Sequence, residues 1–167
     1  GNILIWDYVV QFRNYISPFP NLRVLQPNLE FFADKSCRLM FQQGSGAALS
    51  EFVDLRSYMI AKLLWDPEQD PKEIMKDFLY GYYGDAAPFL SDYIELLHDE
   101  LDLSGDNLWI YGYPYSGIDS YLKPGLIPVY KDLFDRAEQA VDDDPAILDR
   151  VLFARLPLDF AILDMSL

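Results

Sequence analysis

The sequence has a single cysteine and a single histidine, and these two shortages exclude several kinds of site. Cys37 has no second cysteine to pair with, so no disulfide can form within the chain, and we expect a small buried residue. As the only histidine, His98 excludes a metal site built from several histidines and any Ser-His-Asp triad that does not use it. His98 follows two leucines in a predicted helix, which favours a surface or half-buried side chain over a catalytic one. We therefore expect no metal and no cofactor.

Positive charge is also scarce. The chain has 13 Lys and Arg against 27 Asp and Glu, which gives a net charge of -14 at pH 7. Nucleic acids and anionic membrane surfaces are bound by clustered Lys and Arg, whereas the positive residues here are scattered, so neither partner is expected. No apolar run is long enough to span a bilayer, so we expect no membrane insertion.

The two ends of the sequence lack the usual start and stop signals. The chain begins abruptly with Gly1 and Asn2 before an apolar run, and the last predicted helix reaches Leu167 without a C-terminal signal. We interpret the chain as a piece of a longer protein. Its 167 residues, 51% of them apolar, are enough for one domain with a hydrophobic core.

The first 46 residues predict a strand, a helix and a second strand. Residues 3–8 are apolar, β-branched and aromatic, which is typical of a buried strand. A helix is expected over residues 22–35, with Pro27 kinking it or delaying its start, and a second strand over 38–42. The second strand ends in a loop from Gln43 to Gly46. Such a βαβ unit has parallel strands and a right-handed crossover.

The remaining residues predict about five helices, over residues 51–65, 70–84, 86–103, 126–141 and 145–167. In the first of these helices, four apolar residues should share one face: Phe52, Leu55, Met59 and Leu63. Leu64 and Trp65 should widen this face. Arg56 should lie on the opposite, polar side of the helix, either solvated or paired with an acidic neighbour. Asp70 should cap the second, with Pro71 at its first position. The expected fold class is therefore mainly α: a helical bundle of about five helices preceded by a βαβ unit.

Aromatic residues are abundant, and one group alternates along a Gly-rich segment. Trp109, Tyr111, Tyr113 and Tyr115 would point to one side of an extended chain, as in a platform that stacks on sugars. The alternative, which we favour, is that two or three of these rings cover the helical bundle as a lid.

Five stretches carry a resemblance to a known family: IWDYVVQF, PFPNL, FQQG, LRSYMIAKLLWDP and FLYGYYGDAA. In this order they resemble the C-terminal half of a bacterial domain-of-unknown-function family, number 4838. That family is similar in turn to the α-glucuronidases of glycoside hydrolase family 67 and to hexosaminidase-like barrels. The resemblance covers about residues 3–101 and continues weakly through RVLFARLPLDFAIL.

The resemblance implies a division of the chain and a setting for it. Residues 1–46 would be the last two strands and a helix of a (β/α)8 barrel, and residues 47–167 an appended helical region. The resemblance implies that the protein comes from a bacterium that degrades complex glycans. It also implies that the longer parent protein, of which this chain is a piece, is exported to the periplasm or cell surface for polysaccharide utilisation. The unpaired strand edges of an incomplete barrel would also allow a homo-oligomer through the exposed strands.

In a (β/α)8 barrel, functional residues lie at the carboxyl ends of the strands. This implies substrate-binding roles for Trp6, Asp7 and Tyr8 at the end of the first strand, and for Gln42 and Gln43 at the end of the second. The Asp7 carboxylate could accept hydrogen bonds from sugar hydroxyls while the neighbouring rings stack on a pyranose. The alternative is that Trp6 belongs to the core and Asp7 caps a loop.

Hydrolysis of a glycoside generally needs two carboxyl groups about 5 to 10 Å apart, and the predicted strand ends offer only Asp7. We therefore assign no catalytic residue. The expected partner is a glycan or oligosaccharide bound by the intact parent, whose status as a glycosidase stays open, and the chain alone should be inactive. The alternative is a non-catalytic helical module that binds carbohydrate or docks to another domain.

Overall fold

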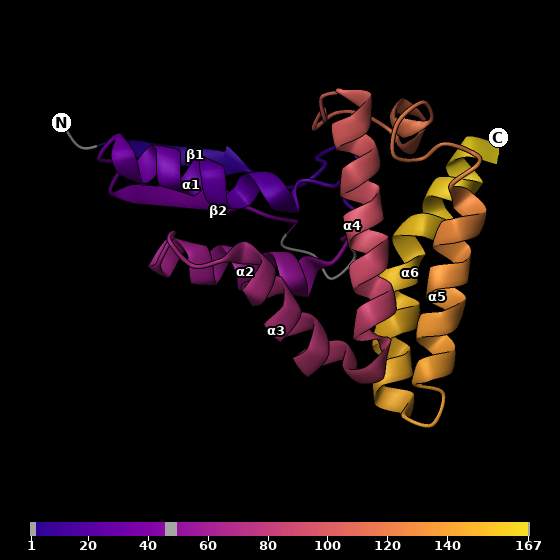
Figure 1. Ribbon diagram of the computed structural model, residues 1–167. Helices are drawn as coiled ribbons and strands as arrows, with labels where there is room; N and C mark the ends of the chain where they lie inside the picture. The colour runs from indigo at the N-terminus through magenta and orange to yellow at the C-terminus, as the bar shows by residue number, and fades with distance from the viewer. Residues whose placement is uncertain (1–2, 46–49, 167) are drawn as a thin grey trace.

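The computed structural model describes residues 3–45 and 50–166 and shows a mainly α-helical protein (Figure 1). The predicted features at Gly1, Asn2, Gly46 and Leu167 lie outside the described residues. Strands and helices follow one another as β1 (Leu4–Tyr8), α1 (Leu25–Asp34), β2 (Leu39–Gln43), α2 (Val53–Trp65), α3 (Pro71–Tyr83), α4 (Ala87–Ser104), α5 (Ile127–Ala140) and α6 (Pro145–Ser166). The predicted fold class, helices preceded by a βαβ unit, is confirmed within the described ranges.

The two strands pair in parallel, with Leu4 opposite Leu39 and Tyr8 opposite Gln43. Alternate residues face opposite sides of a strand, so each strand contributes to two faces. On one face Met40 packs against the hydrophobic core. The other face is exposed, which corrects the expectation of fully buried strands, because no other described element covers it; it presents Leu4, Trp6, Tyr8, Leu39 and Phe41.

Helix α1 starts later than a simple apolar pattern suggests. A 3-10 turn, Leu22–Val24, precedes it, and the α-helix begins at Leu25. Pro27 therefore lies in the first turn, where its missing N–H group would have had no partner within the helix. The predicted delay caused by this proline is confirmed.

The pair α2 and α3 follows the predicted pattern except at one point. The Asp70 side chain accepts a hydrogen bond from the Lys72 N–H at 2.9 Å, and Pro71 is the first residue of α3. The four apolar residues predicted to share one face of α2 are all buried. Leu64 and Trp65 do not widen this face, since Trp65 is 89% exposed. Each residue turns the helix by about 100°, which carries these two side chains away from the core.

Helices α4, α5 and α6 lie side by side as a three-helix group (Figure 1). Their core is aromatic: the ring of Tyr93 lies 5.2 Å from that of Tyr130 and 4.8 Å from that of Phe134. The same core continues through α2 into α1, where Leu25 and Leu29 are buried. Within residues 3–45 and 50–166, the helices are too short or too polar to span a bilayer.

Candidate functional site

The exposed face of the small sheet carries an aromatic pair. Trp6 and Phe41 lie directly opposite each other, and their rings meet edge to face with centroids 4.8 Å apart. The Trp6 Nε1–H group donates a hydrogen bond to the side-chain oxygen of Gln43 on the neighbouring strand. Trp6 is thus held on the surface, and the alternative that it belongs to the core is wrong.

The loop after β1 extends this pair toward α4. The ring of Phe12 lies 5.1 Å from that of Tyr8 and 6.5 Å from that of Tyr111. Tyr111 in turn lies 6.3 Å from Trp109, which is 67% exposed. We use the name aromatic surface for the rings of two neighbouring groups. One is the pair Trp6 and Phe41, and the other is the series of contacts Tyr8, Phe12, Tyr111 and Trp109, which begins two residues after Trp6 on the same face of β1.

Backbone hydrogen bonds hold the two halves of the aromatic surface together. The N–H groups of Phe12 and Arg13 both donate to the Ile110 carbonyl, at 2.6 and 3.2 Å. The buried side chain of Gln11 donates to the Gly112 carbonyl. The guanidinium of Arg13 lies 4.2 Å from the centre of the Tyr113 ring. Segments about a hundred residues apart in the sequence therefore form one continuous surface.

The segment that contains Trp109 and the tyrosines is not extended, which corrects the sequence-based expectation. The Gly112 N–H donates to the Trp109 carbonyl at 2.9 Å and closes a turn, and a 3-10 helix, Pro114–Gly117, follows. The turn and the loop contacts leave Trp109, Tyr111, Tyr113 and Tyr115 exposed. The favoured alternative of a lid over the bundle is therefore wrong.

A buried polar network supports the loop that carries Phe12. Glu51 and Arg56 form an ion pair at 3.2 Å, and the Glu51 carboxylate also accepts a hydrogen bond from the Phe19 N–H group at 2.8 Å. Arg56 also donates to the Asn21 side chain, whose amide donates to the Val9 carbonyl at 3.1 Å. Arg56 is thus buried and does not lie on a solvated side of α2, while the other predicted possibility, pairing with an acidic neighbour, is confirmed by Glu51.

Protonation in this network follows from burial. Burial raises the pKa of the Glu51 carboxyl, while the charge of Arg56 and the Phe19 N–H oppose that rise. Arginine stays protonated even when buried, because its pKa starts so high. The pair therefore adds a fixed positive charge and its counter-ion beneath the loop.

His98 holds the start of the 3-10 turn before α1 against α4. Its Nε2 accepts the Leu22 N–H at 3.0 Å, so its Nδ1 carries the proton and donates to the Ile94 carbonyl at 2.7 Å. Burial lowers the pKa of His98 to about 4. The prediction of a surface or half-buried histidine is wrong, because α4 places it on the side that faces the loop.

The prediction that Cys37 is buried is also wrong, since its side chain is only half-buried.

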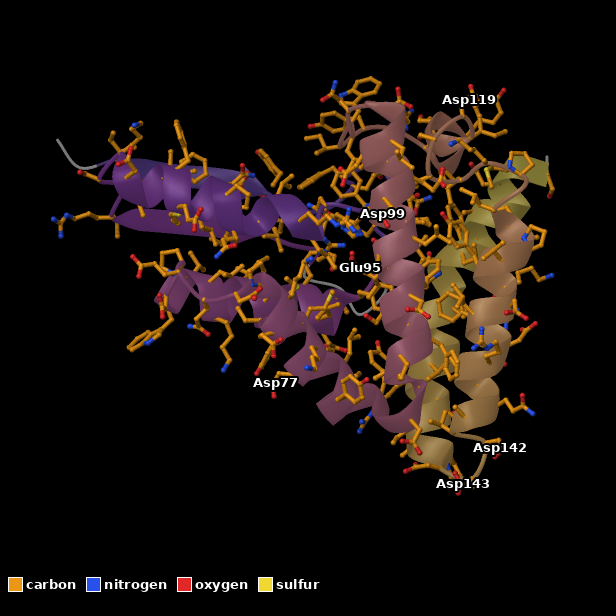
Figure 2. The ribbon with its side chains drawn as sticks, viewed as in Figure 1. Asp77, Glu95, Asp99, Asp119, Asp142 and Asp143 are labelled. Atoms are coloured by element: carbon orange, nitrogen blue, oxygen red, sulfur yellow. The ribbon has the colours of Figure 1, made fainter. Side chains whose placement is uncertain are left out.

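Acidic side chains are spread over the molecule rather than gathered at the aromatic surface. Glu95 and Asp99 project from α4 on the side where Arg23 pairs with both, at 2.7 Å for Asp99 (Figure 2). Figure 2 places Asp119 near one end of the three-helix group, and Asp142 and Asp143 at the opposite end. In the part of the chain that the structure describes, no group of His, Cys, Asp and Glu could hold a metal ion.

The structure brings most of the predicted site residues together. Five of them form the aromatic surface or touch it: Trp6, Tyr8, Gln43, Trp109 and Tyr111. Tyr113 contacts the guanidinium of Arg13, the residue after Phe12. Asp7 and Gln42 lie opposite each other on the other face of the sheet, both half-buried. The aromatic surface can therefore stack on a ligand and form hydrogen bonds with it. Since the surface consists of six aromatic rings, it does not contain the pair of carboxylates that glycoside hydrolysis requires.

Sequence reasoning missed Phe12 and Phe41. The parallel register would have identified Phe41, because the residue opposite Trp6 must share its face. Phe12 lies in an irregular loop, and no periodic pattern points to it. Its role follows only from the contact with Tyr111.

Comparison with known proteins identifies the family. A family model described as a domain of unknown function (DUF4838) matches residues 1–95, more than half of the chain, so the chain belongs to that family. No curated protein and no solved structure matches the chain.

Proposed function

We propose that this chain, as a member of that family, is the C-terminal part of a bacterial carbohydrate-active, glycoside hydrolase-like protein, and that it binds glycan without catalysing hydrolysis by itself. The observation that carries the proposal is the aromatic surface, whose six rings, five of them exposed, reach from the exposed face of the sheet to the loop after α4. Aromatic rings present flat apolar faces that match the C–H face of a pyranose, and their polar edges remain in water.

The geometry of the small sheet agrees with the end of a (β/α)8 barrel. In such a barrel the helices cover the outside, and the other face of each strand points inward. The exposed face of β1 and β2 would then line the interior, with Tyr8 and Gln43 at the carboxyl ends where binding residues belong. Residues 1–46 would complete the barrel and residues 47–167 would form the appended helical region, as the resemblance to family 67 α-glucuronidases implies.

Partners and location follow from the same proposal. In the intact parent, neighbouring strands would pair with the free edges of β1 and β2, whereas in the isolated chain a second copy would do so. The parent would be exported to the periplasm or cell surface, where bacteria meet complex glycans. Any catalytic carboxylates would lie upstream, because Asp7 faces the core side of the sheet.

The three tryptophans allow a test with an internal control. Binding of the chain to a panel of immobilised plant and host oligosaccharides is measured for wild type and for Trp6→Ala, Trp109→Ala and Trp65→Ala. We expect the first two variants to weaken binding by about tenfold or more, which corresponds to about 1.4 kcal/mol. Trp65 is 89% exposed at the end of α2, outside the aromatic surface, so its removal should leave binding unchanged.

Two outcomes would overturn the proposal. One is a wild-type chain that binds no oligosaccharide on the panel. The other is an equal loss in all three variants, which would point to a nonspecific apolar effect. Capture of a protein domain instead of a glycan by the same surface would favour a docking role.

A further inference from the structure

A cavity of about 230 Å³ lies beside the aromatic surface, between the loop after β1, the end of α4 and the segment that precedes α5. Water occupies about 30 Å³ per molecule in the liquid, and pockets for drug-sized ligands have about 300 to 1,000 Å³. The cavity therefore suits one small polar ligand better than an extended chain. Its lining includes Gln11, Ser17, Asp106, Asn107, Trp109 and Tyr113.

The inner wall of the cavity holds an unpaired hydroxyl group. Ser17 is only 1% exposed, and among residues 3–45 and 50–166 its Oγ has no hydrogen-bond partner. Buried polar groups in proteins are nearly always paired, because an unpaired one loses its hydration without compensation. Gln11 on the same wall shows the usual situation, since its oxygen accepts the Asn14 N–H at 2.6 Å and its amide donates to Gly112. The Ser17 hydroxyl is thus unpaired, and rotation about its Cα–Cβ bond would be needed to bring it into contact with a ligand in the cavity that the residue lines.

The mouth of the cavity has a carboxylate next to an amide. Gly105 ends α4 with φ of +69°, a conformation that favours glycine, and so turns the chain away from the helix. The Asp106 N–H then donates to the Ser104 hydroxyl at 3.1 Å, which fixes the start of the turn. The side chains of Asp106 and Asn107 are exposed and form no hydrogen bond with other described residues. Together they can accept from and donate to neighbouring hydroxyls.

We propose that this cavity binds one neutral hexopyranose unit, with Trp109 and Tyr113 against the ring and with Ser17, Asp106 and Asn107 on its hydroxyls. The proposal rests on the carbohydrate-binding function proposed above and specifies the sugar. It disfavours a uronic acid because the lining residues, all within the described part of the chain, include the carboxylate of Asp106 and no Lys, Arg or His; the guanidinium of Arg13 lies over the Tyr113 ring but is not part of the lining. A ligand carboxylate beside Asp106, at the exposed mouth of the cavity, would meet a like charge and be repelled moderately.

Single-tryptophan fluorescence tests the proposal at the cavity itself. The variant Trp6→Phe/Trp65→Phe keeps Trp109 as the only tryptophan and is titrated with D-glucose, D-galactose, D-mannose and D-glucuronate. We expect a saturable change with at least one neutral hexose below about 100 mM, and at least about tenfold weaker binding of glucuronate. No response to any of the hexoses would overturn the proposal, and so would tighter binding of glucuronate.

Two substitutions separate a ligand contact from a structural role. In the same background, Ser17→Ala should weaken hexose binding by about tenfold while the Tm stays equal or rises, because the unpaired hydroxyl is gone. Asp106→Asn should weaken hexose binding and reduce the discrimination against glucuronate. Ser57→Ala on α2 and Asp142→Asn at the far end of the helices are the matched controls, and both should bind as the parent variant does. A lower Tm with unchanged affinity in Ser17→Ala would mean a packing role and would overturn the proposal.

The outcomes also distinguish this inference from the function on which it rests. If the oligosaccharide panel binds through Trp6 and Trp109 but no hexose changes the Trp109 signal, the cavity proposal fails and the glycan-binding surface stands. If neither experiment shows binding, both fail.

Discussion

The carboxylate of Glu51 lies 3.2 Å from the guanidinium of Arg56, and both side chains are almost completely buried. The pair joins the start of α2 to the loop after β1, because Glu51 also accepts the Phe19 N–H and Arg56 also binds Asn21. This loop carries Phe12, the ring that connects the two halves of the aromatic surface. The shape of the candidate site therefore depends on a charge pair beneath it.

Removal of Arg56 should be costly. Arg56→Met leaves the Glu51 carboxylate buried without its counter-ion, and we expect unfolding in urea to show a loss of about 3 to 5 kcal/mol. Lys76→Met is the control, since Lys76 and Glu73 form an exposed pair at 3.8 Å whose loss should cost less than about 1 kcal/mol. Equal effects of the two substitutions would contradict a buried pair.

Stability should fall in mild acid because of His98. Its pKa is about 4 in the folded protein and 6.5 for an ordinary histidine, so the unfolded chain binds the proton more readily. The contribution of His98 is complete above pH 6.5 and is lost as the pH falls toward 4, by about 1.4 kcal/mol per pH unit at most. His98→Gln keeps an oxygen for the Leu22 N–H and does not titrate.

The measurement compares urea unfolding of both proteins at pH 7.5 and pH 4.5. Wild type should lose about 2 kcal/mol more than His98→Gln over this interval, and the carboxyl groups common to both cancel in the difference. Parallel losses in the two proteins would mean that His98 is not buried as a neutral group.

The core face of α2 is tested by two adjacent leucines. Leu63 is completely buried, and Leu63→Ala should destabilise the fold by about 2 to 5 kcal/mol in chemical unfolding. Leu64 is exposed, and Leu64→Ala should cost less than about 1 kcal/mol. A loss below about half a kcal/mol for Leu63→Ala would show that the helix faces the core with another side.

Gly117 should not accept a side chain. A Cβ atom at this position would lie 2.7 Å from Cζ of the buried Tyr121, so Gly117→Ala must displace this ring and should lower stability by about 1 to 3 kcal/mol. Gly81 in α3 has open space around it, and Gly81→Ala should instead raise stability by about 0.5 to 1 kcal/mol, because alanine favours a helix. Thermal unfolding of both variants tests the two signs together.

The chain alone should not hydrolyse aryl-glucuronides or other aryl-glycosides, because the aromatic surface has no pair of carboxyl groups. Release of nitrophenol from chromogenic substrates measures this directly. Turnover that disappears in Asp7→Asn and persists in Asp142→Asn would show that Asp7 takes part in catalysis and would refute the expectation.

Local features of the fold could be predicted because neighbouring residues determine them. Asp70 with Pro71 marked the start of α3, and the spacing of Leu55, Met59 and Leu63 marked the buried face of α2. The two short apolar runs marked strands that pair in parallel. Each of these signals lies within one turn of helix or one strand.

The candidate site needed information that no local pattern contains. Arg56 is buried where Asn21, 35 residues away, and the nearby Glu51 accept hydrogen bonds from the two terminal NH2 groups of its guanidinium. His98 is buried because its partner is the backbone of Leu22, 76 residues away. The sequence suggested two separate aromatic groups, and only long-range contacts show that they meet: the bond between Gln11 and Gly112, 101 residues apart, and the bonds from the Phe12 and Arg13 N–H groups to the Ile110 carbonyl.

Helix α4 continues without a break from Ala87 to Ser104, past the last residue of the segment that the family shares. Its buried residues lie on both sides of that limit, with Tyr93 and Ile94 before it and Leu97 and His98 after it. An expression clone that stopped at the limit would end in mid-helix and lose the histidine that anchors Leu22. The limit therefore marks where sequence similarity ends, and shorter versions of this protein should be designed to retain the whole helix.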